Sequence, residues 1–270
     1  GIISGSGGVT IDKGGSAQLS AINTYTGPTQ INGVTGDQGI LLISGLGSIA
    51  ASSYVESNGV FDISRAWAPV SITDLRGTGQ VNLGGKNLTI TDGKSTFSGN
   101  IVDGGEYQVA GGSVTIAGGT QTFAGQNTYT GGTYLSGSST LNLTGSMIGN
   151  LTIAPGATFN TNGNYSTGSG STLINAGSFN SPSGIGFWNA GLSANTGTMN
   201  SAVLNTGSFL NNGNLVGNFM NMGTLAGTGG IAGTLDNWGI VAPGTPYGTM
   251  TVNGAYTQYS SGTFQPGVSP

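Results

Sequence analysis

Apolar side chains recur at every second position in short runs along most of the chain. Val9 and Ile11 form one such run, and Val114 and Ile116 form another. Glycine, asparagine, threonine and serine separate the runs. A period of two is typical of β-strands that bury one face, and the chain shows no helical period. The pattern therefore predicts an all-β chain of many short strands joined by tight turns.

Two phrases return along the chain and indicate its repeat length. Asn-Thr-Tyr-Thr-Gly occupies residues 23–27 and again 127–131, a spacing of 104 residues. Ala-Pro-Gly occupies residues 154–156 and again 242–244, a spacing of 88 residues. Both spacings are near multiples of about 21 to 22, a length expected to stack as single coils. We therefore predict a right-handed parallel β-helix of about twelve coils, in which neighbouring coils pair at about 4.8 Å.

Sharp turns in every coil explain the abundance of glycine and asparagine. The chain has 54 glycines, far above ordinary usage. Glycine takes positive φ without a steric penalty, and asparagine tolerates the left-handed conformation. Asparagines stacked from coil to coil are also expected to hydrogen-bond along a ladder. The C-terminal half repeats an Asn-x-Gly pattern that starts at Asn175, Asn195, Asn205, Asn211, Asn221 and Asn237.

Charged residues are scarce and concentrated in the N-terminal part of the chain. They make up 5% of the sequence, and after Glu106 the only one is Asp236. An ordinary globular surface is about 25 to 35% charged, so this surface must be solvated by asparagine, threonine, serine and backbone groups. That composition favours an extracellular protein over a cytosolic enzyme. With five basic residues and a net charge of -4, nucleic acid is not an expected partner.

Several catalytic classes are excluded by composition. The chain has no cysteine and no histidine, which excludes disulfides, thiolate or histidine metal sites and a Ser-His-Asp arrangement. Asp103 and Glu106 remain as an acid/base pair or a cation site, as in a polysaccharide-active β-helix enzyme. A solvated turn is the favoured interpretation of this pair. We therefore expect a protein without enzymatic activity, cofactor or metal.

Aromatic side chains are the best candidates for a partner-binding surface. Arg65 and Trp67 lie in a stretch, residues 44–72, that is less repetitive and leaves an irregular insertion open. Phe187 and Trp188 form a second candidate pair. Aromatic residues of this kind anchor protein and sugar ligands, but they also stack inside coils. For Trp67 and Trp188 both interpretations stay open.

Residues 74–141 carry a recognisable series of short motifs. They contain Gly-Thr-Gly at 77–79, Leu-Thr-Ile at 88–90, Thr-Phe-Ser-Gly at 96–99 and Asn-Thr-Tyr-Thr-Gly-Gly-Thr at 127–133. This series resembles the autotransporter-associated β-strand repeat of passenger domains in bacterial type V secretion. Residues 1–36 resemble it again, with Pro28 at the place of the usual second glycine. The resemblance covers a little over a third of the chain.

The resemblance implies a division of the chain into two parts. Residues 1–224 are expected to form a β-helix stalk, including the Asn-x-Gly coils of 150–224. Residues 225–270 resemble the autochaperone at the end of a passenger. Residues 225–268 are expected to be the most stable part and to template the formation of the coils before them. A translocator barrel would follow in such a protein, and the sequence ends at Pro270 without one. We therefore expect a passenger fragment.

The function implied by the resemblance is attachment at the bacterial cell surface. The favoured hypothesis is a non-enzymatic adhesin or self-association protein, secreted or anchored to the outer membrane as a precursor. Its partner would be another copy of itself, a host or matrix protein, or a glycan. In the alternative hypothesis, the chain is only the stalk and autochaperone of a longer protein whose active head, a protease, lipase or toxin, precedes residue 1.

Overall fold

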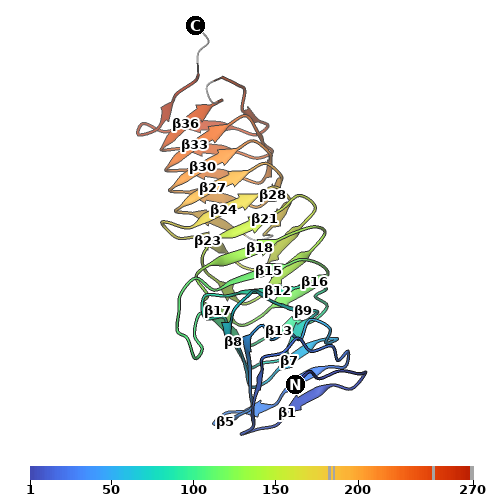
Figure 1. Cartoon of the computed structure of the whole chain (residues 1–270). Helices are drawn as coiled ribbons and strands as arrows, with labels where there is room; N and C mark the ends of the chain where they lie inside the picture. The colour runs from blue at the N-terminus through green and yellow to red at the C-terminus, as the bar shows by residue number, and fades with distance from the viewer. Residues whose placement is uncertain (182–183, 185, 245–246, 268–270) are drawn as a thin grey trace. The chain divides into compact units, whose positions relative to one another are not determined.

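The computed structural model describes residues 1–181, 184, 186–244 and 247–267, which divide into two compact units, Gly1–Gly149 and Asn150–Pro270. Throughout these described ranges the chain forms short strands and turns and no helix. Apart from one hairpin, the strands pair in parallel, each with a strand of a neighbouring coil (Figure 1). Together the units hold about 13 turns. The predicted all-β parallel β-helix is confirmed, and its right-handedness stays a prediction.

The first unit contains four ladders of parallel strands, a further strand pair and one antiparallel hairpin. The first ladder comprises β1 (Val9–Ile11), β3 (Thr29–Ile31), β7 (Val55–Ser57) and β10 (Leu75–Arg76). The second comprises β2 (Ser16–Leu19), β6 (Ile40–Gly45), β8 (Val60–Ala66), β11 (Gln80–Asn82) and β14 (Asn100–Val102). The third comprises β9 (Val70–Ile72), β12 (Asn87–Ile90), β15 (Ser113–Ile116) and β18 (Gly132–Leu135). The fourth comprises β13 (Thr96–Phe97), β16 (Thr120–Phe123) and β19 (Thr140–Leu143). The strand pair is β17 (Gln126–Asn127) with β20 (Ser146–Met147), and the hairpin is β4 (Gly33–Val34) with β5 (Asp37–Gln38).

The second unit is more regular and contains three ladders, one for each side of its coils. The first comprises β21 (Leu151–Ile153), β24 (Thr172–Asn175), β27 (Leu192–Asn195), β30 (Ser208–Asn211), β33 (Thr224–Gly227), β36 (Ile240–Pro243) and β39 (Thr263–Phe264). The second comprises β22 (Thr158–Thr161), β25 (Ser178–Asn180), β28 (Thr198–Asn200), β31 (Asn214–Val216), β34 (Gly230–Ile231) and β37 (Thr251–Val252). The third comprises β23 (Tyr165–Thr167), β26 (Phe187–Asn189), β29 (Val203–Asn205), β32 (Phe219–Asn221), β35 (Leu235–Asn237) and β38 (Tyr256–Gln258).

The alternation of apolar and polar residues determines which side chains enter the core. In β15, Val114 and Ile116 are completely buried, whereas Thr115 faces outward. Val114 lies in register between Leu88 of β12 and Thr133 of β18. Each inward position therefore packs on the same position of the coils before and after it, and the core is a continuous column within the unit.

The coil length is variable, which corrects the predicted repeat of 21 to 22 residues. Asn175 bonds to Asn195 across 20 residues, but Asn195 bonds to Asn211 across only 16. The two Ala-Pro-Gly phrases, at β21 and β36, are five steps apart along their ladder rather than four. The shorter coils reach 16 residues because two-residue corners join strands of three or four residues.

The corner glycines of the second unit serve mainly for close packing between coils. Gly207, Gly223 and Gly239 do not have positive φ. A Cβ at Gly223 would lie 2.1 Å from the carbonyl oxygen of Gly207, and a Cβ at Gly239 would lie equally close to that of Gly223. Because no side chain fits in this space, glycine is required at these corners. The prediction that such glycines supply a left-handed turn is therefore wrong here.

Buried asparagines form two hydrogen-bonded ladders in the second unit. In one, the side-chain Nδ2 of each residue donates to the Oδ1 of the next over 2.7 to 2.8 Å, through Asn189, Asn205, Asn221 and Asn237. The other comprises Asn175, Asn195 and Asn211. The predicted ladders are confirmed. No asparagine of the described ranges has positive φ, so the predicted left-handed conformation is wrong.

The repeated phrase forms a corner of a coil in the first unit, and its asparagine and tyrosine are buried. Tyr25 and Tyr129 are buried, and each hydroxyl bonds to a threonine four residues later. The Nδ2 of Asn127 donates to the carbonyl of Ser146, one coil further on, at 3.0 Å. The phrase thus joins neighbouring coils, and its tyrosine fills the core.

Residues 44–72, where the sequence left an insertion open, contribute β7, β8 and β9 to the ladders. The excursions lie elsewhere, at the β4–β5 hairpin and at residues 103–112. The division into compact units falls after Gly149, whereas the stalk and autochaperone boundary expected after residue 224 stays a prediction. No helix long and apolar enough to cross a membrane occurs in the part of the chain that the structure describes.

Candidate ligand-binding groove

A β-bulge in β8 determines where the side chains of Arg65 and Trp67 point. Leu42 of β6 pairs with Asp62, but Ser44 pairs with Arg65, so β8 has one extra residue at this point. A bulge of this kind redirects the following side chains. Arg65 is half-buried, Ala66 is buried and Trp67 is exposed, so the arginine and the tryptophan face the same side.

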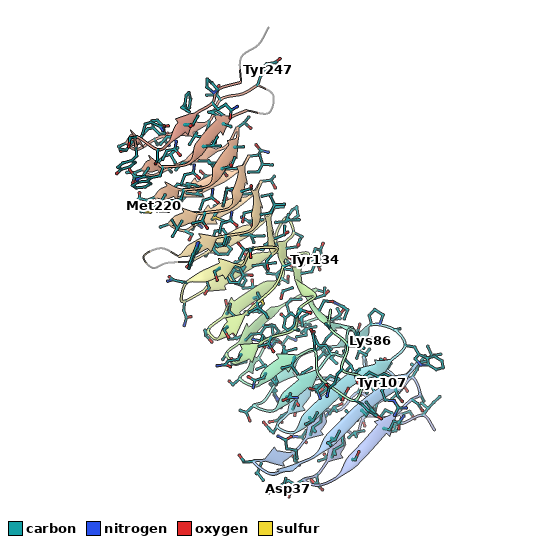
Figure 2. The ribbon with its side chains drawn as sticks, turned by 90° about the vertical axis from the view of Figure 1, so that its left-hand side faces the viewer. Asp37, Lys86, Tyr107, Tyr134, Met220 and Tyr247 are labelled. Carbon is teal, nitrogen blue, oxygen red and sulfur yellow. The ribbon has the colours of Figure 1, made fainter. Side chains whose placement is uncertain are left out.

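Residues 103–112 leave the coil after β14 and pack against the outer face of β8. The backbone N–H of Glu106 donates to Oδ2 of Asp62 at 3.0 Å, and that of Tyr107 donates to Oγ of Ser64 at 3.1 Å. Asp62 and Ser64 are buried under this segment, with 6% and 1% exposure. Two outward polar side chains of β8 therefore hold the segment in place. Figure 2 shows Tyr107 on the outside of the unit.

The guanidinium of Arg65 is fixed by this segment. Its Nη1 donates to both carboxylate oxygens of Glu106, at 3.0 and 3.1 Å. Its Cζ lies 5.6 Å from the ring centroid of Tyr107, within the range of a cation–π contact. The hydrogen bond that Arg65 donates to Glu106, followed by the charge of that carboxylate, raises the pKa of Arg65 above its ordinary value. Arg65 is thus charged, oriented and paired.

A groove of about 400 Å³ lies between this segment and the strands of the second ladder. We call it the Arg65–Trp67 groove, and it is lined by Gln18, Ser20, Ser44, Gly45, Leu46, Arg65, Trp67 and Tyr107. Trp67 is 78% exposed, which is unusual for so large an apolar side chain. The Nε2 of Gln18 donates to Oγ of Ser44 at 2.8 Å, so this amide is held in position too.

The predicted acid/base candidates are engaged with different partners. The carboxylate of Asp103 accepts hydrogen bonds from the backbone of Gly112 at 2.9 Å and from the hydroxyl of Thr130 at 2.6 Å. That of Glu106 binds Arg65. Asp103 thus stabilises the ends of the segment, and Glu106 orients the arginine. Among the residues the structure describes, no three or more acidic side chains gather where a metal ion would bind.

Phe187 and Trp188, the second pair predicted to bind a partner, lie in the other unit, one in the core and one on the surface. Phe187 is completely buried, and the centroid of its ring lies 5.5 Å from that of Phe179 and 6.4 Å from that of Phe209. It therefore belongs to the core, and its assignment to a binding surface is corrected. The next residue along β26, Trp188, faces outward because side chains alternate; it is 50% exposed and donates to Thr206 at 3.2 Å.

Sequence reasoning found Arg65 and Trp67 and missed most of the remaining lining. Gln18, Leu46 and Tyr107 come from three different coils, and nothing in their local sequence marks them. One signal was present at Tyr107, since the alternation of apolar and polar residues stops between residues 102 and 113.

Comparison of the chain with protein-family models, with curated proteins and with solved structures found no match in any of the three.

Proposed function

We propose that this chain is a non-enzymatic attachment protein whose parallel β-solenoid presents the Arg65–Trp67 groove to a partner. The observation that carries the proposal is the fixed Arg65 beside Trp67, whose side chain is largely exposed. Tryptophan and arginine are the residues most enriched among the energetic anchors of interfaces. A groove on paired strands also holds such anchors rigidly, which reduces the entropy lost on binding.

The proposed location is the surface of a bacterial cell or the medium around it. The resemblance to autotransporter passenger repeats supports this location. The scarcity of charge also supports it, because the 164 residues after Glu106 carry one ionisable acidic or basic side chain, Asp236. The proposed partner is a copy on another cell, a matrix or host protein, or a glycan.

Display of the chain on a non-aggregating bacterium tests the proposal. We expect faster sedimentation or stronger surface attachment than for cells without the chain. We also expect Trp67→Ala to remove most of that gain and Trp188→Ala, at an exposed tryptophan of the other unit, to preserve it. Attachment equal to that of control cells, or equal for both variants, would overturn the proposal.

A further inference from the structure

We propose that the Arg65–Trp67 groove binds a neutral pyranose sugar of a glycan, with one face of the ring stacked on Trp67. The inference rests on the proposed attachment function and specifies its ligand. The groove combines an exposed aromatic platform with polar side chains that the protein already holds in place. A pyranose has the matching chemistry, because C–H groups cover one face of its ring and hydroxyls surround its edge.

The apolar part of the groove suits one face of a sugar ring. Trp67 is 78% exposed and Leu46 is 61% exposed, so both present apolar surface to solvent. An indole ring is large, rigid and flat, and the negative potential of its face attracts the polarised C–H groups of a sugar. A groove of about 400 Å³ is within the size range of small-molecule sites.

The polar part of the groove suits the hydroxyls at the ring edge. A guanidinium carries five N–H donors, and Glu106 engages Nη1 of Arg65 while Tyr107 accepts a further hydrogen bond, so donors remain for a ligand. The amide of Gln18 uses one N–H on Ser44, which leaves its second N–H and its Oε1. Ser20 adds a hydroxyl to the lining. Planar donors held in fixed positions bind a ligand with little loss of side-chain entropy.

The charge of the groove favours a neutral ligand over an acidic one. Arg65 is the charged residue of the lining, and Glu106 pairs with it at 3.0 Å. An acidic sugar or an acidic peptide at the remaining donors of Arg65 would be repelled by the carboxylate of Glu106, which already balances the charge of the guanidinium. A basic ligand would be repelled by Arg65. A neutral sugar can accept hydrogen bonds from the guanidinium while the ion pair stays intact.

Binding of simple sugars to the full chain tests the inference. The probes are the methyl glycosides of glucose, galactose, mannose and N-acetylglucosamine, with methyl glucuronoside as the acidic comparison. Saturation-transfer NMR and tryptophan fluorescence report binding. We expect at least one neutral glycoside to bind with a dissociation constant on the order of 1 mM. We expect Trp67→Ala to weaken it about tenfold or more and Trp67→Phe to weaken it less, since a ring remains.

Two further variants define the site. Gln18→Ala should weaken the neutral glycoside about threefold, because one directed hydrogen bond is lost. Trp188→Ala is the matched control and should leave binding unchanged. Preferential binding of the glucuronoside, or equal loss for Trp67→Ala and Trp188→Ala, would overturn the inference. If no probe or longer neutral oligosaccharide binds, while cell attachment still depends on Trp67, the sugar is excluded and the attachment function stands. Attachment that is independent of Trp67 overturns the attachment function itself.

Discussion

At the scale of single residues, buried amides link one coil of the second unit to the next. Asn205 accepts a hydrogen bond from Nδ2 of Asn189, and its own Nδ2 donates to Asn221 and to the carbonyl of Thr224. Each of these asparagines is completely buried. A buried polar group without a partner costs about 1 to 3 kcal/mol, so the ladder stabilises the unit only while it is unbroken.

We therefore expect Asn205→Ala to lower the free energy of unfolding by about 3 kcal/mol, because it leaves buried groups of Asn189, Asn221 and Thr224 with fewer partners. Asn200→Ala is the matched control. Asn200 also bonds along a ladder, to Asn180, but lies on the exposed outer face, so its loss should cost about 0.5 kcal/mol or less. Urea denaturation of the full chain measures both. Equal costs would contradict a special role for the buried ladder.

Because Tyr129 of the repeated phrase is buried, we expect the chain to lose stability at alkaline pH. Burial raises the pKa of Tyr129 above its ordinary value of about 10, whereas the hydrogen bond to Thr133 lowers it less. Below pH 10 the Tyr129 hydroxyl is protonated in both the folded and the unfolded chain, so its contribution to the free energy of unfolding is fully present. It is lost as the pH rises above about 10, because only the unfolded chain releases the proton.

Tyr129→Phe should reduce the loss of unfolding free energy with rising pH by up to about 1.4 kcal/mol per pH unit above pH 10. Urea midpoints measured from pH 8 to 11.5 give the slope. Tyr134→Phe, at a side chain 43% exposed, is the control and should keep the slope of the unaltered chain. A slope that Tyr129→Phe leaves unchanged would show that other groups cause the alkaline loss.

At the scale of the element, the corners between strands determine how closely coils stack. We expect Gly223→Ala to destabilise the chain by about 2 kcal/mol, because the added methyl group would lie 2.1 Å from the carbonyl oxygen of Gly207. Gly168→Ala is the matched control, since a Cβ there meets nothing within 4 Å. It should be neutral or slightly stabilising, because alanine restricts the unfolded chain. Thermal unfolding of both variants would contradict the close-packing role if their midpoints agreed.

The strands could be predicted from the sequence because each depends on local alternation. Val114 and Ile116 lie in the core because they are the apolar positions of an alternating strand, as the sequence pattern predicts. The groove could not be predicted, because it depends on contacts between distant segments. Arg65 meets Glu106 across 41 residues, and the bulge that turns Arg65 outward appears only when β8 is paired with β6. Phe187 shows the same limit in reverse, since which of two adjacent aromatic residues faces inward depends on strand register.

At the scale of the whole molecule, the C-terminal residues differ from the coils before them. All three residues of β38 and both residues of β39 are exposed. Strands such as β29 and β32 have a hydrogen-bonded neighbour on each side and bury their inward side chains. The expectation that residues 225–268 are the most stable part stays a prediction, and the exposed strands favour the opposite order at residues 251–264.

Hydrogen exchange followed by mass spectrometry tests this order of stability in the intact chain. We expect amides of residues 187–237 to exchange slowest in the second unit, since they lie between paired coils joined by the buried asparagine ladders. Amides of residues 251–264 should exchange much faster, because few buried contacts hold their strands. Asn205→Ala should speed exchange in the strands next to it without altering the first unit. Slower exchange in β38 than in β29 would contradict this order and would restore a templating role for the C-terminal coils.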